Sequence, residues 1–187
     1  MEYNIYDEKS APEDAQETLA QAKEKYGFVP NLLGTMANAP TLLKGYVALN
    51  ELFSKTSLSP TEQQVVLLTV SRENECAYCV AAHSKIAAMH KLPDDVITAL
   101  RDDKTLPDIK LEALSTFTQL VVVSKGWPKD EEVTSFLKAG FNPQQVLEVV
   151  LGVGLKILSN YTNHISRVVL DSAFSETVWE SGKKTAA

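Results

Sequence analysis

The chain lacks the features that mark several large classes of protein. Its 187 residues include only two cysteines, so no framework of disulfides holds it together. Asp and Glu (24) outnumber Lys and Arg (18), the net charge is −6, and the basic residues form no stripe. Nucleic acids and anionic membrane surfaces attract basic patches. We therefore expect neither as a partner.

Long apolar runs are also missing. The best candidate, residues 146–158, is interrupted by Glu148 and Lys156, whereas a membrane-spanning helix needs about 18 consecutive apolar residues. Residues 1–4 are acidic and polar and contain neither the basic nor the apolar region of a secretory signal. We expect a soluble cytoplasmic protein, in which thiols stay reduced unless they cycle.

Helical spacing of apolar residues dominates the chain, and no segment alternates as a strand would. The length suits a single domain, 1–187, that buries about 70% of the surface of the unfolded chain. Residues 175–187 are expected to form a flexible polar tail. The predicted fold class is all-α, with helices near 11–26, 40–54, 60–73, 75–90, 94–101, 108–125, 130–138 and 143–165.

Capping patterns support several of these helix starts. Ser59 precedes a proline and lies three residues before Glu62, the spacing of a capping box. Asn142 also precedes a proline, at the start of the last long helix. Ser10 has the capping-box spacing to a glutamate. Asn74 is expected to cap the helix that carries both cysteines.

The two cysteines stand three residues apart and are followed by a histidine, in Cys76-Ala77-Tyr78-Cys79 and His83. Residues three, four and seven apart share one face of a helix, so two sulfurs and an imidazole should lie along one stripe. Cys76 in the first turn would gain from the helix dipole, which favours a thiolate. His83, four residues after Cys79, is positioned to take its proton as a base. The stripe indicates thiol redox chemistry.

Other interpretations of the stripe remain open. The thiols are small enough to be structural core residues. Cys76, Cys79 and His83 also have the ligand types of a zinc site with water in the fourth position, or of an interaction module without turnover. We expect no cofactor.

Three stretches resemble the carboxymuconolactone decarboxylase/alkylhydroperoxidase D-like (AhpD-like) superfamily, and in particular its peroxidase-related branch. They are residues 26–32 (YGFVPNL), 58–64 (LSPTEQQ) and 74–83 (NECAYCVAAH); residues 160–164 (NYTNH) look like the late helix of the family. The likeness runs from about residue 20 to 172. The cysteine-centred stretch is the specific one.

The resemblance implies an all-α bundle that forms homo-oligomers, commonly trimers or hexamers, and a thiol-dependent peroxidase of the peroxiredoxin type. It implies that Cys79 attacks a hydroperoxide, that Cys76 resolves the product as a disulfide, and that His83 serves a proton relay. An external dithiol, such as a thioredoxin- or lipoyl-type reductant, would then restore the thiols. Gln64 stands where the best-described members have a relay glutamate, and glutamine cannot accept a proton.

Five further residues are possible pocket residues in this framework: Tyr78, Glu62, Asn160, Asn163 and His164. Tyr78 lies between the cysteines, where the family can carry a histidine. Glu62 could replace the missing glutamate, although its capping-box position explains it without catalysis. The superfamily name also suggests a lactone decarboxylase or isomerase, but that chemistry has no evident need for paired thiols.

Overall fold

The computed structural model describes residues 2–181, which fold into helices and connecting loops without a strand in that range. The long helices match the predicted segments to within a few residues at each end. In chain order, the elements are α1 (Glu13–Tyr26), α2 (Asn31–Met36), α3 (Pro40–Ser54), α4 (Pro60–Glu73), α5 (Ala77–Met89), α6 (Asp94–Asp102), α7 (Ile109–Val123), α8 (Asp130–Lys138), α9 (Pro143–Ser166) and the 3-10 helix η1 (Ser172–Thr177).

The caps explain where most of these helices begin. The capping box predicted at Ser59 is confirmed, with reciprocal hydrogen bonds to Glu62, and Asn142 caps α9 in the same way. The box predicted from Ser10 is wrong. Its hydroxyl pairs with Asp7 instead, and α1 follows Pro12 with no side-chain cap.

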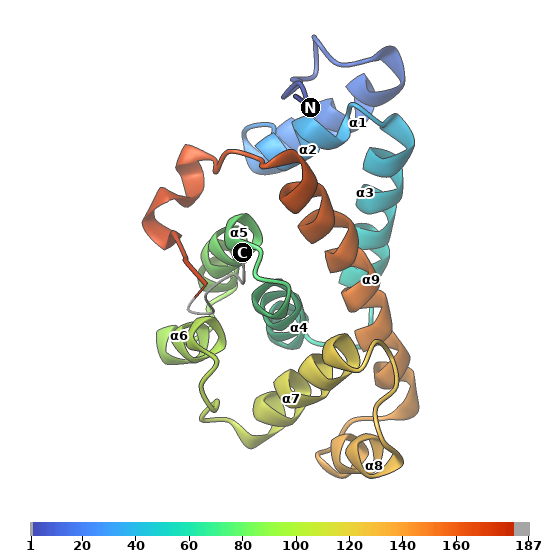
Figure 1. The fold of residues 1–187 in the computed structure, drawn as a ribbon, viewed down its shortest axis with the longest axis vertical. Coiled ribbons are helices and arrows are strands. Elements are labelled where there is room, and N and C mark those ends of the chain that lie inside the picture. Colours follow the sequence, from blue (N-terminus) through green and yellow to red (C-terminus); the bar gives the residue numbers. More distant parts are fainter. Residues whose placement is uncertain (1, 182–187) are drawn as a thin grey trace.

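Helix α4 lies at the centre of the molecule, with α5, α7 and α9 packed around it (Figure 1). It is buried over most of its length because apolar residues occupy more than one of its faces, as in Val65–Leu68. Helix α9 passes close to α3 and α4 at Gly152. A Cβ at this position would stand 2.7 Å from Val66 Cγ1 and 2.8 Å from Phe53 Cε2. A larger residue there would push α9 away from α3 and α4.

Two buried clusters result. The larger one fills the space between α4, α6, α7, α8 and α9. The second lies between α1, α2, α3 and α5, and it contains both cysteines. The thiols therefore lie inside the bundle, where α5 meets the N-terminal helices and α9 passes alongside.

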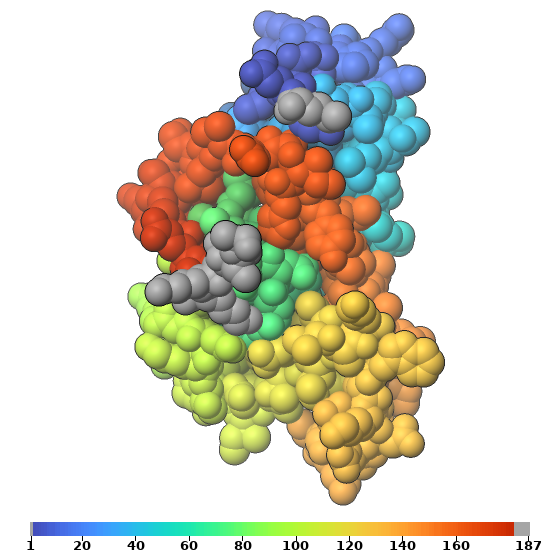
Figure 2. All heavy atoms as spheres, in the orientation of Figure 1, coloured from blue at the N-terminus to red at the C-terminus, as the bar shows by residue number. Residues whose placement is uncertain are grey.

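Two elements near the ends of the chain were not predicted. Helix α2 is too short to show a helical repeat. The segment 172–181, including part of the predicted flexible tail, returns across α5 and α6 (Figures 1 and 2). Thr177 donates to Ala81 O, and Trp179 Nε1 donates to Arg101 O. The rest of the predicted tail, 182–187, lies outside the described residues.

In the described part of the chain, no helix combines the length and apolar character needed to cross a membrane.

Candidate functional site

A sharp corner between α4 and α5 brings the first cysteine to the start of α5. Glu75 adopts a left-handed conformation (φ 54°) at this corner, and Cys76 is the N-cap of α5. The prediction that Asn74 caps this helix is wrong, because Asn74 ends α4. Its side chain instead donates Nδ2–H to Oδ1 of Asn160, at 2.9 Å, and so links the corner to α9.

The two cysteines are free thiols that approach each other to 3.1 Å. Both are almost fully buried, with Cys76 1% and Cys79 2% exposed. Cys79 is the third residue of α5, so it lies among the N–H groups at the positive end of the helix dipole. One helical turn therefore presents both sulfurs to each other, as the spacing predicts.

Polar groups from α9 surround the sulfur of Cys79. Asn163 donates Nδ2–H to this sulfur at 3.3 Å. Burial by itself raises the pKa of the Cys79 thiol. The hydrogen bond from Cys76, the positive charge of Lys156 and polar contacts with Asn160 and Ser159 outweigh burial, and they lower the pKa of Cys79 below its ordinary value.

Cys76 has the opposite tendency. Its hydrogen bond to Cys79, together with burial, raises the pKa of Cys76. The environment therefore favours the thiolate at Cys79 and the protonated thiol at Cys76.

Lys156 is the cation nearest this charge, and it is only 1% exposed. Its ammonium group donates to Nε2 of His83 at 3.0 Å. Among residues 2–181, no carboxylate lies within ion-pair distance of Lys156. A buried ammonium needs a compensating negative charge. The charge of Lys156 in turn favours the thiolate at Cys79.

His83 and Gln64 complete the polar cluster. Since an ammonium can only donate, Nε2 of His83 must accept, and the ring proton must reside on Nδ1. Nδ1 lies 3.2 Å from Oε1 of Gln64, so this N–H donates to the amide oxygen. Burial, followed by the charge of Lys156, lowers the pKa of His83 well below its usual value. The neutral imidazole is therefore favoured, and His83 as a whole residue is partly exposed.

Two amide atoms beside the thiols form no hydrogen bond of good geometry, although Asn160 is close enough to the Cys79 sulfur to lower the pKa of that thiol. Within the described residues, buried side-chain atoms of this kind are Nδ2 of Asn160 and Oδ1 of Asn163. The other polar atom of each amide is hydrogen-bonded. Oδ1 of Asn160 accepts from Asn74, and Nδ2 of Asn163 donates to the Cys79 sulfur and to Ser159 O. One free donor and one free acceptor thus lie in the polar cluster around Cys79.

The other three predicted pocket residues lie elsewhere. Tyr78 points toward α2 and η1, where its hydroxyl donates to Asp171. Glu62 caps α4 through Ser59 and pairs with Lys110 at 2.8 Å. The side chain of His164 is exposed on α9.

Lys156 and its contact with His83 were missed by the sequence reasoning, which treated this lysine only as an interruption of an apolar run. A signal was present, however. Lys156, Asn160 and Asn163 are spaced i, i+4 and i+7, so they form a polar stripe on an otherwise apolar helix. A lysine on the buried face of such a helix indicates a paired charge.

The described residues contain no group of three His, Cys, Asp or Glu side chains arranged to hold a metal ion. Cys76, Cys79 and His83 do not form such a group, because Nε2 of His83 faces the Lys156 ammonium. A divalent cation at that point would be repelled by the lysine.

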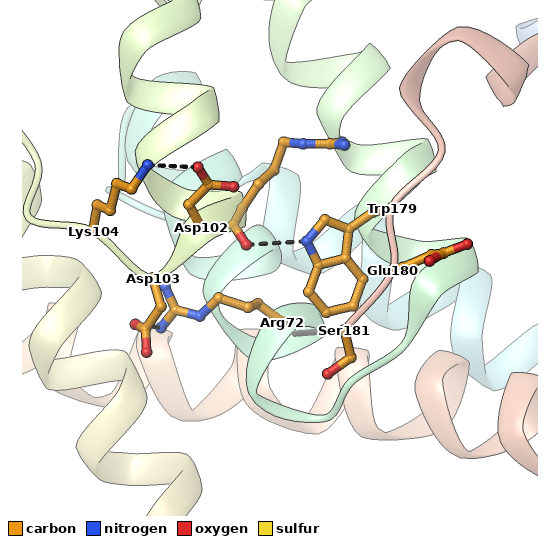
Figure 3. Close-up of a pocket in the computed structure, with 8 residues that line it drawn as sticks. Arg72, Asp102, Asp103, Lys104, Trp179, Glu180 and Ser181 are labelled. Atoms are coloured by element: carbon orange, nitrogen blue, oxygen red, sulfur yellow. Dashed lines mark hydrogen bonds and ion pairs between the residues drawn. The ribbon is translucent and has the colours of Figure 1, made fainter. Parts of the chain in front are cut away.

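A surface pocket of about 450 Å³ lies away from the thiols (Figure 3). Arg72 contacts Glu73 at 2.7 Å and Asp103 at 3.0 Å, and Trp179 closes one side.

Residues 40–106, which include the cysteine pair, match the model of the carboxymuconolactone decarboxylase family. No curated protein matches the chain. Among solved structures, the chain is similar to the alkylhydroperoxidase AhpD core of an uncharacterized peroxidase-related protein from Ralstonia eutropha JMP134. That match has 20% identity and a TM-score of 0.83, and it covers 92% of this chain and 93% of the other.

A peroxidase-related protein from Silicibacter sp. TM1040 is similar at 19% identity, over 93% of this chain and 95% of that one, with a TM-score of 0.80. The debrominase Bmp8, in complex with 2,3,4-tribromopyrrole, is similar at 16% identity over 94% of both chains, with a TM-score of 0.79. At these identities the likeness establishes the fold. The predicted resemblance is thus confirmed: residues 40–106 carry the carboxymuconolactone decarboxylase family pattern, and the chain has the fold of the AhpD-like proteins.

Proposed function

We propose that the protein is a thiol-dependent peroxidase that reduces hydroperoxides through a disulfide cycle of Cys76 and Cys79. The observation that carries this proposal is the approach of the two free thiols to 3.1 Å, at the start of one helix. A disulfide between them needs only a small further approach, because an S–S bond is about 2.05 Å long. A cytoplasmic location, where external dithiols are abundant, suits such a cycle.

Cys79 is the attacking residue in this proposal. A thiolate, not a thiol, is the nucleophile, and the charge of Lys156 favours the thiolate at Cys79. The sulfur attacks the terminal oxygen of the hydroperoxide, and the O–O bond breaks. The products are a sulfenic acid on Cys79 and an alcohol, which takes one proton from the protein.

Cys76 then resolves the sulfenic acid. Its thiol attacks the sulfur of Cys79, an S–S bond forms, and the hydroxyl leaves as water with the proton of Cys76. Two electrons have passed from the two thiols to the peroxide. An external dithiol reduces the disulfide by exchange and restores both thiols.

The free amide atoms of Asn160 and Asn163 match the reacting group. A hydroperoxide has one O–H donor, for which Oδ1 of Asn163 is an acceptor. It also has oxygen lone pairs, for which Nδ2 of Asn160 is a donor. The surrounding cluster is closely packed and buried, which favours small hydroperoxides over bulky ones.

His83 serves the proton relay, with Gln64 orienting it through Nδ1–H. His83 is partly exposed as a residue and contacts Lys156 at Nε2, which makes it the candidate link between the buried site and protons of the solvent. In this role Gln64 needs only to accept a hydrogen bond, and a glutamate is not required.

A titration of reduced protein with stoichiometric hydrogen peroxide tests the proposal. Both thiols should be lost together and should return with dithiothreitol. Cys79→Ser should abolish peroxide consumption. Cys76→Ser should still consume one equivalent and then stop at the sulfenic acid, which a dimedone adduct detects. Thiols that remain free in the wild type, or full turnover by Cys79→Ser, would overturn the proposal.

We also propose that the chain forms a homo-oligomer through the outer face of α9. Leu147, Val150, Tyr161 and Ile165 are 50–72% exposed and share one side of this helix. Exposed apolar residues gathered on one face mark an interaction surface. Light scattering should find a trimer or hexamer for the wild type and smaller species for the double variant Leu147→Glu/Ile165→Glu. A monomeric wild type would contradict this interface.

A further inference from the structure

We propose that Lys156 is the paired cation of the Cys79 thiolate and the acid that protonates the departing oxygen, and that it becomes neutral once the disulfide has formed. Only the role toward the departing oxygen rests on the peroxidase function proposed above. The pairing with Cys79 and the loss of the proton on oxidation do not.

The geometry of α9 carries the first part of this inference. Lys156 is fully buried, and the same face of α9 presents Asn163, whose amide contacts the sulfur of Cys79. An ammonium has three N–H donors, of which His83 accepts one. Two donors remain, and the charge of the ammonium acts on the Cys79 sulfur through space. With no carboxylate in ion-pair distance in residues 2–181, the thiolate is the counter-charge.

Proton balance carries the second part. Reduction of a hydroperoxide to an alcohol and water takes up two electrons and two protons. The two cysteines supply both electrons, but as a thiol and a thiolate they hold only one proton, that of Cys76. The second must come from another group, and the ammonium of Lys156 is the donor at the site. The site is thus neutral overall before the reaction and after it.

The charge on Lys156 is unfavourable once the thiolate is gone. A disulfide carries no charge, so an ammonium left beside it would be buried without a compensating negative charge, which is energetically costly. The other titratable groups at the site cannot compensate. His83 is neutral, and Tyr46 of α3, which packs beside the thiols, has its pKa raised by burial and remains protonated. Loss of the lysine proton restores neutrality.

The pairing is tested by the ultraviolet absorbance of the thiolate in reduced protein, followed against pH. In the wild type one thiolate should persist below the ordinary range of cysteine. In Lys156→Met, which removes the charge and keeps the length, its titration should move up by one pH unit or more. Lys156→Arg should stay close to the wild type. Lys85→Met is the matched control, because Lys85 pairs with Glu176 at the surface of α5 and should have no effect. Equal titrations in wild type and Lys156→Met would overturn the pairing.

The loss of the proton is tested on the wild type alone, by redox equilibrium with dithiothreitol between about pH 6 and 8. Reduction of oxidised dithiothreitol takes up two protons in this range. If oxidation of the protein releases two, from Cys76 and Lys156, the equilibrium constant is independent of pH. If Lys156 keeps its proton, oxidation of the protein releases only one proton. The equilibrium constant for this oxidation then falls tenfold for each unit by which the pH rises, and the inference is wrong. Neither measurement uses peroxide, so a protein that fails to turn over peroxide can still pass both.

Discussion

The ammonium group of Lys156 lies 3.0 Å from Nε2 of His83, although 73 positions separate the two residues in the chain. This contact fixes the tautomer of the imidazole, because the lysine can only donate. It also joins the cysteine helix α5 to the last long helix, α9. Residues from two helices far apart in the sequence therefore meet beside the thiols.

Replacement of His83 should slow the chemistry without removing the thiols. In His83→Gln, Lys156 loses its contact with the imidazole, and the relay to solvent is broken. We expect single-turnover reduction of hydrogen peroxide to slow by about 10²–10⁴-fold, the usual contribution of a proton-transfer group. Stopped-flow measurement on reduced protein reports this rate. His164→Gln, on an exposed histidine of α9, should react at the wild-type rate. Equal rates in all three proteins would remove His83 from the mechanism.

Gln64→Glu should charge the imidazole. A carboxylate next to Nδ1–H stabilises the imidazolium, so it should raise the pKa of His83 from its lowered value. Titration of the His83 ring protons by NMR measures this shift directly. Gln63→Glu adds the same charge at the neighbouring, partly exposed position and should leave His83 unchanged. If the first variant also leaves the titration of His83 unchanged, then Gln64 does not orient the ring.

Stability should fall on acidification, and His83 should contribute to the fall. The pKa of His83 is lowered in the folded state. Below about pH 6.5, the imidazole therefore binds a proton in the unfolded chain but stays neutral in the folded protein. The stabilisation of the folded state relative to the unfolded one is complete above that pH. It decreases by at most about 1.4 kcal/mol per pH unit below it. The thiolate of Cys79 acts in the same direction, since its pKa is also lowered.

Urea unfolding at about pH 8 and pH 5.5 measures this dependence. His83→Gln should show a smaller loss of stability between the two pH values than the wild type. The exposed His164→Gln should parallel the wild type, and parallel curves for His83→Gln as well would contradict the assignment.

Tyr78→Phe should lower the stability of the fold and leave the reaction of the thiols with peroxide unchanged. Its hydroxyl donates to the buried carboxylate of Asp171, which also accepts from the N–H of Asn31. Loss of a hydrogen bond to a buried charged group costs about 1–3 kcal/mol, measured by urea unfolding. Tyr161→Phe, at an exposed tyrosine, should cost almost nothing. A large loss of peroxide reactivity in a folded Tyr78→Phe variant would place Tyr78 in the site after all.

The parts of the fold that follow local rules could be predicted from the sequence. The caps at Ser59 and Asn142 and the spacing of Cys76 and Cys79 are properties of short segments. Lys156 could not be placed in this way, because its partners come from another helix. The start of α5 was misplaced because Asn74 looks like an N-cap, while its amide in fact contacts α9. Tertiary contacts decide both cases.

The order of synthesis adds a consequence to the two-helix construction of the site. A nascent chain that has been made only as far as α5 has both cysteines but not α9, which supplies the positive charge and the amides beside Cys79. Until that later segment emerges from the ribosome and packs, the thiols should behave like ordinary cysteines, with little thiolate at neutral pH. If the protein has the proposed reactivity toward hydroperoxides, that reactivity arises only when the polypeptide is almost complete, and half-made chains are protected from premature oxidation.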